Sequence, residues 1–181
     1  MASRKDVAVP EPYQNYVNCA SDDDLLKAIK NSTKRFWKLV RIIPKKKFNY
    51  AYAEGKWTIR QVVQHIIDVE RVFVLRALWF TRKDASAQPG FDENTWAENA
   101  RVTDRKWKDM IEEFLALRAA NELFFASLND DELMRTGTSG SKTVSTLAFG
   151  FISAGHLEHH INILEQRYLP EPPKAPKKKK K

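Results

Sequence analysis

Four long stretches of the chain repeat their apolar side chains at intervals of three and four residues, which is the period of an amphipathic helix. They span residues 21–43, 58–82, 103–128 and 143–169. No alternating strand pattern competes with them, and each apolar stripe is buried most simply against the other three helices. The sequence therefore predicts an all-α fold, an antiparallel four-helix bundle.

The second stretch has the best-marked start. Thr58 and Gln61 form a T-x-x-Q capping box, and Trp57 and Val62 fit the hydrophobic staple that fixes how a chain enters a helix. We therefore predict a helix that begins at Thr58 and presents His65 on its apolar face. That face comprises Val62, His65, Ile66, Val69, Val72, Phe73 and Arg76.

The other three helices have less sharply defined ends. The first is expected from near Ser21, where three aspartates follow at the positive end of the helix dipole, to just before Pro44. The third is expected from Thr103 to Leu128, and the fourth ends by Pro170. The residues expected to form the core of the first and third helices are Leu25, Ile29, Phe36, Leu39, Val40, Ile43, Trp107, Met110, Ile111, Phe114, Leu117, Leu123, Phe124 and Leu128.

Three of the four histidines lie in the segment AGHLEHHINIL, residues 154–164. His156 and His160 are one helical turn apart on one face, so both can reach the same metal ion. His65 supplies a third imidazole if the bundle brings the second and fourth helices together. Three neutral nitrogens with an open coordination position are typical of a catalytic metal site. His159 points about 60° to the other side and is expected to flank the site.

The residues leave alternatives open. A single histidine on an apolar face is more often a hydrogen-bonded core residue than a ligand, although two adjacent buried imidazoles would then need separate partners. Leu157 follows His156, so the H-E-x-x-H signature of metalloproteases is absent. Asp68 either orients a ligand imidazole or pairs with Arg71 or Arg76, and Asp92, with Glu93 beside it, either lines the mouth of the site or caps a short helix. Asp68 and Asp92 are therefore candidates only, and no catalytic residue is assigned.

Charge and composition narrow the possible partners. The net charge of +8 comes mostly from residues 170–181, a proline- and lysine-rich tail, so the body is nearly balanced. We expect a solvated tail that contacts nucleic acid or anionic lipid weakly at most.

The single cysteine, Cys19, excludes an internal disulfide, and no apolar run is long enough to span a bilayer. We expect a cytoplasmic protein with an N-terminal arm (1–20), a bundle (21–169) and a disordered tail (170–181).

Three motifs carry a resemblance to a known family: KWTIRQVVQHIIDVE in the second helix, GFDEN in the loop and GHLEHHINIL in the fourth helix. With them the chain resembles the DinB superfamily, in particular its YfiT-like and DinB_2 group of metal-binding four-helix bundles. The resemblance implies an up-down-down-up bundle, a homodimer, and metal ligands at His65, His156 and His160. It favours zinc or nickel, with iron or manganese as further choices.

These observations lead to one favoured function and two others. The favoured hypothesis is a metal-dependent enzyme of the thiol S-transferase type, in which the cation stabilises the thiolate of a small thiol for attack on a small electrophile. The same open position could ionise water, which would make the protein a metal-dependent hydrolase. A third hypothesis is a non-catalytic helical binding module with structural histidines.

Overall fold

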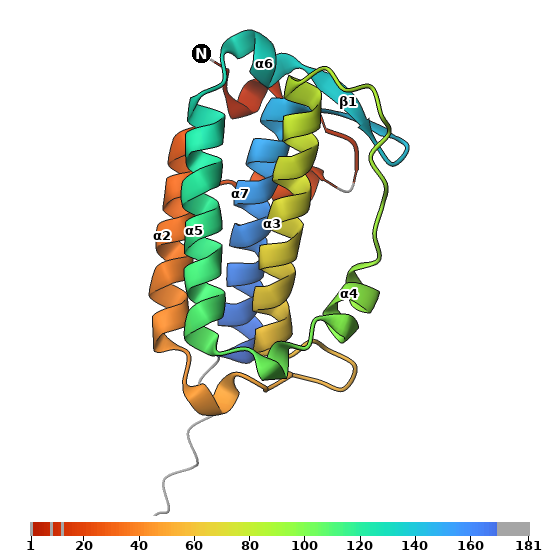
Figure 1. Ribbon diagram of the computed structural model, residues 1–181. Helices are drawn as coiled ribbons and strands as arrows, with labels where there is room; N and C mark the ends of the chain where they lie inside the picture. The colour runs from red at the N-terminus through yellow and green to blue at the C-terminus, as the bar shows by residue number, and fades with distance from the viewer. Residues whose placement is uncertain (1, 8, 12, 170–181) are drawn as a thin grey trace, which may run out of the picture.

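The computed structural model describes residues 2–7, 9–11 and 13–169, and most of them are helical (Figure 1). Four long helices form a bundle: α2 (Leu25–Ile42), α3 (Ile59–Thr81), α5 (Trp107–Ala126) and α7 (Thr146–Ile163). A π-helical turn, Leu164–Tyr168, continues α7. The prediction of a four-helix bundle is confirmed.

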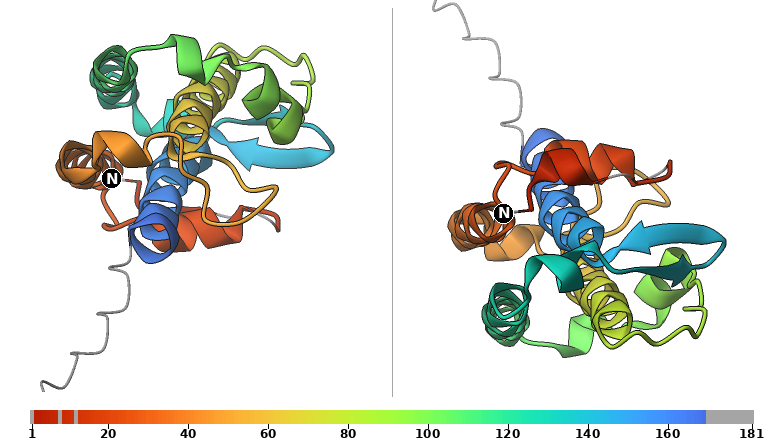
Figure 2. Two further views of the ribbon diagram at one scale, coloured as in Figure 1. Left: turned by 90° about the horizontal axis from the view of Figure 1, so that it is seen from below. Right: turned by 90° about the horizontal axis from the view of Figure 1, so that it is seen from above.

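The four helices follow an up-down-down-up order. The colours in Figure 1 show that α2 and α7 run in one direction, and α3 and α5 in the other. Helix α7 packs against α2 and α3, and α5 packs against the same two helices. Seen along the bundle, α2 and α3 therefore lie diagonally opposite each other (Figure 2). The neighbours α3 and α7 are antiparallel, as are α2 and α5, whereas the other two neighbouring pairs are parallel.

Shorter elements close the ends and one side of the bundle. Helix α1 (Gln14–Cys19) lies along α7, and α4 (Glu93–Asn99) forms within the long loop that follows α3. Helix α6 (Asp130–Met134) leads into a hairpin of β1 (Thr136–Ser139) and β2 (Lys142–Ser145), with Thr136 opposite Ser145. The remaining short elements are 3-10 turns at Arg4–Asp6, Lys45–Lys47 and Val102–Asp104. The sequence was expected to have no strand, so the hairpin is an addition to the predicted fold.

The caps explain where the helices begin. The Thr58 side chain accepts from the Gln61 backbone N–H while the Gln61 side chain accepts from the Thr58 backbone N–H, as the capping box predicts. Ser145 caps α7 by accepting from the backbone of Ala148. The expected start of the first helix was wrong by a few residues, because Asp24, and not Ser21, accepts from the first turn. The third begins at Trp107, since Val102–Asp104 forms a separate turn.

The core contains the predicted stripe of the first helix in full, but the stripe of the third helix needs a correction. Leu123 is 73% exposed and does not belong to the core. Its place is taken by Arg118, Asn121 and Phe125, which are buried on the same face as Phe114. Two of these three residues are polar, so α5 brings hydrogen-bonding groups into the centre of the bundle.

The structure describes most of the N-terminal segment but not the C-terminal tail. The segment expected to be an arm contributes α1, which packs against α7. The tail, residues 170–181, lies outside the described residues. Among the described residues, no helix is both long and apolar enough to cross a membrane.

Candidate metal centre

The bundle brings together the three histidines expected to be metal ligands. His65 comes from the second turn of α3, and His156 and His160 lie one turn apart near the end of α7. The Nε2 atom of His156 is 3.0 Å from Nε2 of His65 and 3.0 Å from Nε2 of His160. One nitrogen from each ring can be chosen so that all three lie within 4.8 Å of one another. These three side chains are called the histidine cluster below.

Burial keeps the histidine cluster uncharged. It lowers the pKa of His65 to about 4, with a smaller contribution from His159. Burial also holds the pKa of His156 and that of His160 well below 6.5, and the neighbouring imidazoles act in the same direction. All three rings are therefore neutral near pH 7, and each has one nitrogen lone pair available to a cation.

The cluster is poorly satisfied by its own hydrogen bonds. Each neutral imidazole has a single N–H, so Nε2 of His156 cannot bond fully to both facing nitrogens at once. Nδ1 of His160 is buried and has no hydrogen-bond partner among the described residues. Nitrogens bound to a tetrahedral zinc ion lie about 3.3 Å apart, close to the spacing seen here. The donor set therefore fits a divalent cation better than it fits three core histidines.

Aromatic rings surround the cluster and orient it. The ring of Trp57 lies 4.7 Å from that of His65, and Phe73 lies 5.6 Å from His156. The ring of Tyr16, in α1, lies 5.1 Å from that of His156 and 5.4 Å from that of His159, and both pairs are T-shaped. These contacts restrict ring rotation and reduce access of water to the buried side of the cluster.

Helix α1 reaches the cluster because of a glycine. A Cβ atom at Gly155 would lie 1.7 Å from the backbone oxygen of Tyr16, so only glycine lets α1 approach α7 this closely. Sequence reasoning assigned this segment to an arm and missed Tyr13 and Tyr16 as residues of the site. The glycine directly before His156 was the available signal, but it does not say which segment approaches it.

Two cavities adjoin the cluster. The larger one has a volume of about 330 Å³ and is lined by all three histidines together with Tyr13, Tyr16, Trp57, Val69, Phe73, Arg76, Gly90, Phe91 and Glu93. A second cavity of about 250 Å³ shares Trp57 and His160 with the first and extends toward Tyr52, Lys56 and Tyr168. The cluster is thus accessible to a small molecule from two cavities.

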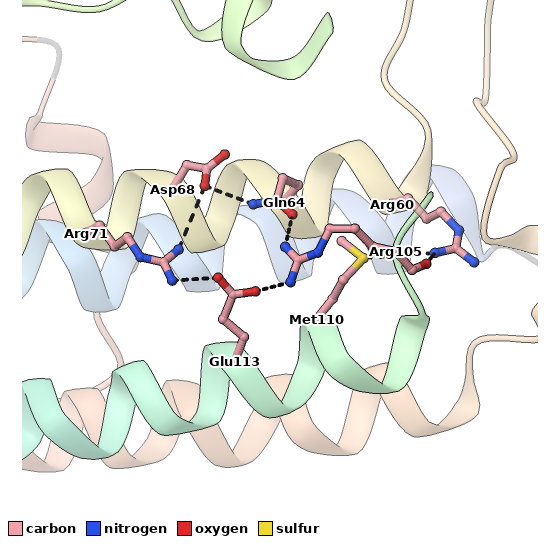
Figure 3. Close-up of polar contacts among 7 residues, drawn as sticks. All are labelled: Arg60, Gln64, Asp68, Arg71, Arg105, Met110 and Glu113. Atoms are coloured by element: carbon pink, nitrogen blue, oxygen red, sulfur yellow. Dashed lines mark hydrogen bonds and ion pairs between the residues drawn. The ribbon is translucent and has the colours of Figure 1, made fainter. Parts of the chain in front are cut away.

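Asp68 takes part in a polar network between α3 and α5 and does not line either of these two cavities. It accepts from Gln64 at 2.9 Å and lies 3.9 Å from Arg71, which also pairs with Glu113 (Figure 3). Arg105 joins Gln64 and Glu113 in the same network. Burial raises the pKa of Asp68, and the hydrogen bond from Gln64 and the positive charge of Arg71 offset part of that effect. These contacts agree with the interpretation of Asp68 as an ion-paired residue.

The remaining candidates lie at the edge of the site. Asp92 is the N-cap of α4: its carboxylate accepts from the Thr95 backbone at 2.6 Å, and this bond lowers its pKa. Glu93, the next residue, is exposed and lines the larger cavity. His159 is half-buried and lies beside the cluster, in contact with Tyr16 and His160.

Comparisons with known proteins agree with this geometry. A family model described as the DinB superfamily matches residues 28–164. A Bacillus cereus protein (strain ATCC 10987 / NRS 248) named "Putative metal-dependent hydrolase" is 28% identical over 143 residues, which cover 76% of this chain and 80% of the relative. A protein of the same name from Geobacillus thermodenitrificans is 38% identical over 52 residues, 29% of each chain.

Two solved structures share the fold. YfiT from Bacillus subtilis, described as a probable metal-dependent hydrolase with an unusual four-helix bundle topology, superposes with a TM-score of 0.67 at 17% identity, over 86% of this chain and 85% of YfiT. The mycothiol-dependent maleylpyruvate isomerase superposes with a TM-score of 0.61 at 10% identity, over 93% of this chain and 63% of that protein. The relatives' names and the histidine cluster together support a divalent metal and an enzyme.

Proposed function

The chain belongs to the DinB superfamily, and from that premise we propose that it is a metal-dependent enzyme which joins a small thiol to an electrophile. The observation that carries the proposal is the convergence of the histidine cluster on one point next to two cavities. His65, His156 and His160 would hold the cation through their ring nitrogens. Zinc and nickel are the metals we favour, since both accept imidazole ligands.

A bound divalent cation supplies positive charge that lowers the pKa of a coordinated thiol, so that thiolate is available at neutral pH. The chain then needs no cysteine of its own at the site, and Cys19 is not among the residues that line either cavity. In the reaction the thiol sulfur forms a bond to the electrophilic carbon, the leaving group departs with its bonding electrons, and the thiol proton passes to solvent.

The cavities favour a reaction with two organic substrates. Because both cavities include Trp57 and His160, a thiol in one and an electrophile in the other would meet at the cluster. Tyr16 and Phe73 cover His156, so this side of the cluster is shielded from water. Excluding water in this way prevents hydrolysis of the electrophile, which would compete with attack by the thiolate.

Hydrolysis is the second candidate, and two observations favour it. The relatives from Bacillus cereus and Geobacillus thermodenitrificans both bear the name "Putative metal-dependent hydrolase". Glu93 lines the larger cavity and is a carboxylate that could accept a proton from an attacking water.

Metal analysis of purified protein tests the site. We expect about one divalent metal per chain in the wild type and its loss from His65→Ala and His160→Ala, with circular dichroism showing that all variants are folded. His159→Ala is the matched control, since it removes a histidine from the same helix outside the cluster, and it should retain the metal. A wild type that takes up no metal after incubation with zinc or nickel would refute the proposal. If His65→Ala destabilised the fold without lowering the metal content, His65 would be structural.

Product analysis separates thiol from water. Metal-loaded protein is incubated with an electrophile such as 1-chloro-2,4-dinitrobenzene and with cysteine or glutathione, and separately with activated esters. A thioether product that depends on both the thiol and His160 supports transfer. Ester cleavage without thiol, lost in Glu93→Gln and His160→Ala, supports hydrolysis instead. Light scattering of the same samples tests the homodimer that the family resemblance leads us to expect.

A further inference from the structure

Arg76 is buried without a counter-charge. Among the described residues, two arginines have less than a tenth of their surface exposed: Arg118, at 2%, and Arg76, at 5%. Arg118 pairs with Glu70 at 3.0 Å. Arg76 has no carboxylate within 4.0 Å in the described part of the chain, and Glu93, which lines the same cavity, lies beyond that distance. Burying a cation without a counter-charge lowers the stability of the fold, so we look for a role of Arg76 other than stability.

Neutral groups orient Arg76 without balancing its charge. Its Nη2 donates to the backbone oxygen of Pro89 at 2.6 Å, and its guanidinium lies over the ring of Phe91, 5.9 Å from the centroid. Tyr13 lines the same cavity and is also uncharged in its hydroxyl form. A guanidinium has five N–H donors in a planar fork, so these contacts leave donors for a ligand.

Arg76 and the histidine cluster lie toward opposite ends of the larger cavity. His65 and Arg76 are eleven residues apart on the same face of α3, which corresponds to about 16 Å along the helix axis. The arginine side chain leans back toward the start of the helix and shortens that separation. Val69 and Phe73 line the cavity between them. The cavity therefore has nitrogen ligands at one end, an apolar wall, and a fixed positive charge at the other.

We propose that the substrate in this cavity carries a carboxylate that pairs with Arg76 while its other end lies at the histidine cluster. The placement of the substrate's reacting end at the histidine cluster rests on the proposed function. The pairing of a carboxylate with Arg76 does not depend on it. A single guanidinium balances one negative charge and matches a carboxylate with two parallel hydrogen bonds. A phosphate monoester, with nearly two charges at neutral pH, would need further donors of positive charge that the cavity lining does not offer.

A pair of ligands that differ only in charge tests this site. Isothermal titration calorimetry measures the binding of 4-phenylbutyrate and of 4-phenylbutyramide to the whole chain as purified. Phenylalkanoates of other lengths are measured in the same way to find the best fit. We expect the carboxylate to bind roughly 10- to 100-fold more tightly than the amide, as for a charge-assisted hydrogen bond. Arg76→Gln should abolish that preference. Arg71→Gln is the matched control, because Arg71 lies on the same helix in the α3–α5 network, and it should keep the preference.

The outcomes separate this proposal from the metal site. In His65→Ala, which is expected to lack the metal, the carboxylate preference should persist. Loss of the preference there would mean that the carboxylate bound the metal, and it would overturn the assignment to Arg76. Equal binding of carboxylate and amide to the wild type, or an unchanged preference in folded Arg76→Gln, would also overturn it. If Arg76→Gln does not fold, Arg76→Lys keeps a charge but loses the planar fork, and it should weaken the carboxylate while leaving the amide unchanged.

Discussion

Replacing Glu70 by glutamine should destabilise the protein strongly, because Glu70 balances the buried charge of Arg118. The two side chains are 4% and 2% exposed, and Nη2 lies 3.0 Å from Oε2. Ser153 donates to the same carboxylate at 2.5 Å and Asn121 at 2.8 Å, while Arg118 reaches Ser32 at 3.4 Å. The network therefore joins α2, α3, α5 and α7 at the centre of the bundle.

The expected loss follows from burial. Removing one partner of a buried ion pair costs about 3–5 kcal/mol, because the other charge is left without compensation. For a domain of this size that corresponds to a fall in melting temperature of roughly 6–20 °C. Arg118→Met should cost a similar amount. The double replacement Glu70→Leu with Arg118→Met should cost much less than the two single changes together, since neither charge of this pair then remains without its partner.

Urea denaturation followed by circular dichroism measures these free energies of unfolding. Glu112→Gln is the control, because Glu112 forms an exposed pair with Lys108 on the same helix, α5, and its loss should change stability by no more than about 0.5 kcal/mol. If Glu70→Gln cost as little as Glu112→Gln, or if the single changes were additive, the central network would not hold the bundle in register.

Two further changes have defined outcomes. Gly155→Ala should displace α1 and lower the free energy of unfolding by about 1–3 kcal/mol, because its Cβ would meet backbone atoms. Gly150→Ala should cost less, because its Cβ would meet only side chains, those of Leu25 at 2.7 Å and Phe125 at 3.2 Å; urea denaturation compares the two variants. Burial would raise the pKa of Glu113, but the bonds from Arg105 and Arg71 hold it below the ordinary value of 4.5. Its contribution to stability is therefore present above that value and lost as the pH falls through the folded-state pKa, so the stability difference between wild type and Glu113→Gln should shrink between pH 5 and pH 3.

The parts of the fold that follow from local chemistry were predictable from the sequence. The capping box at Thr58 and the buried stripe of the first helix appear as expected. The start of that helix does not follow from the sequence, because Ser21 and the aspartates after it are all capable caps; in the structure Asp24 is the cap. The hairpin is absent from the prediction because the strand Thr136–Ser139 has no alternating apolar pattern. The hairpin depends instead on the pairing of β1 with β2 and on the turn at Gly140, which has a φ of 61°.

The site was predictable to a similar extent. The spacing of His156 and His160 follows from helix geometry, and the stripe of the second helix includes both His65 and Arg76. The role of Arg76 could not be inferred, because whether an arginine is paired depends on residues distant in sequence. Arg118 and Asn121 occupy buried positions of α5, which a stripe defined by apolar residues alone does not include. A polar residue at a core position is thus a signal of a buried network, and α5 contains two of them.

The positions of the histidines within their helices constrain the topology. His65 lies near the start of α3, and His156 and His160 lie near the end of α7. In a simple up-down-up-down bundle the second and fourth helices run parallel and face each other diagonally, so the start of one and the end of the other would lie at opposite ends of the molecule. In the up-down-down-up order the same two helices are antiparallel neighbours, and the start of α3 lies beside the end of α7. A shared site for these three histidines therefore requires the long connection between the parallel helices α3 and α5, residues 82–106, which returns the chain to the end of the bundle where α3 began. That connection is as important to the site as the histidines themselves.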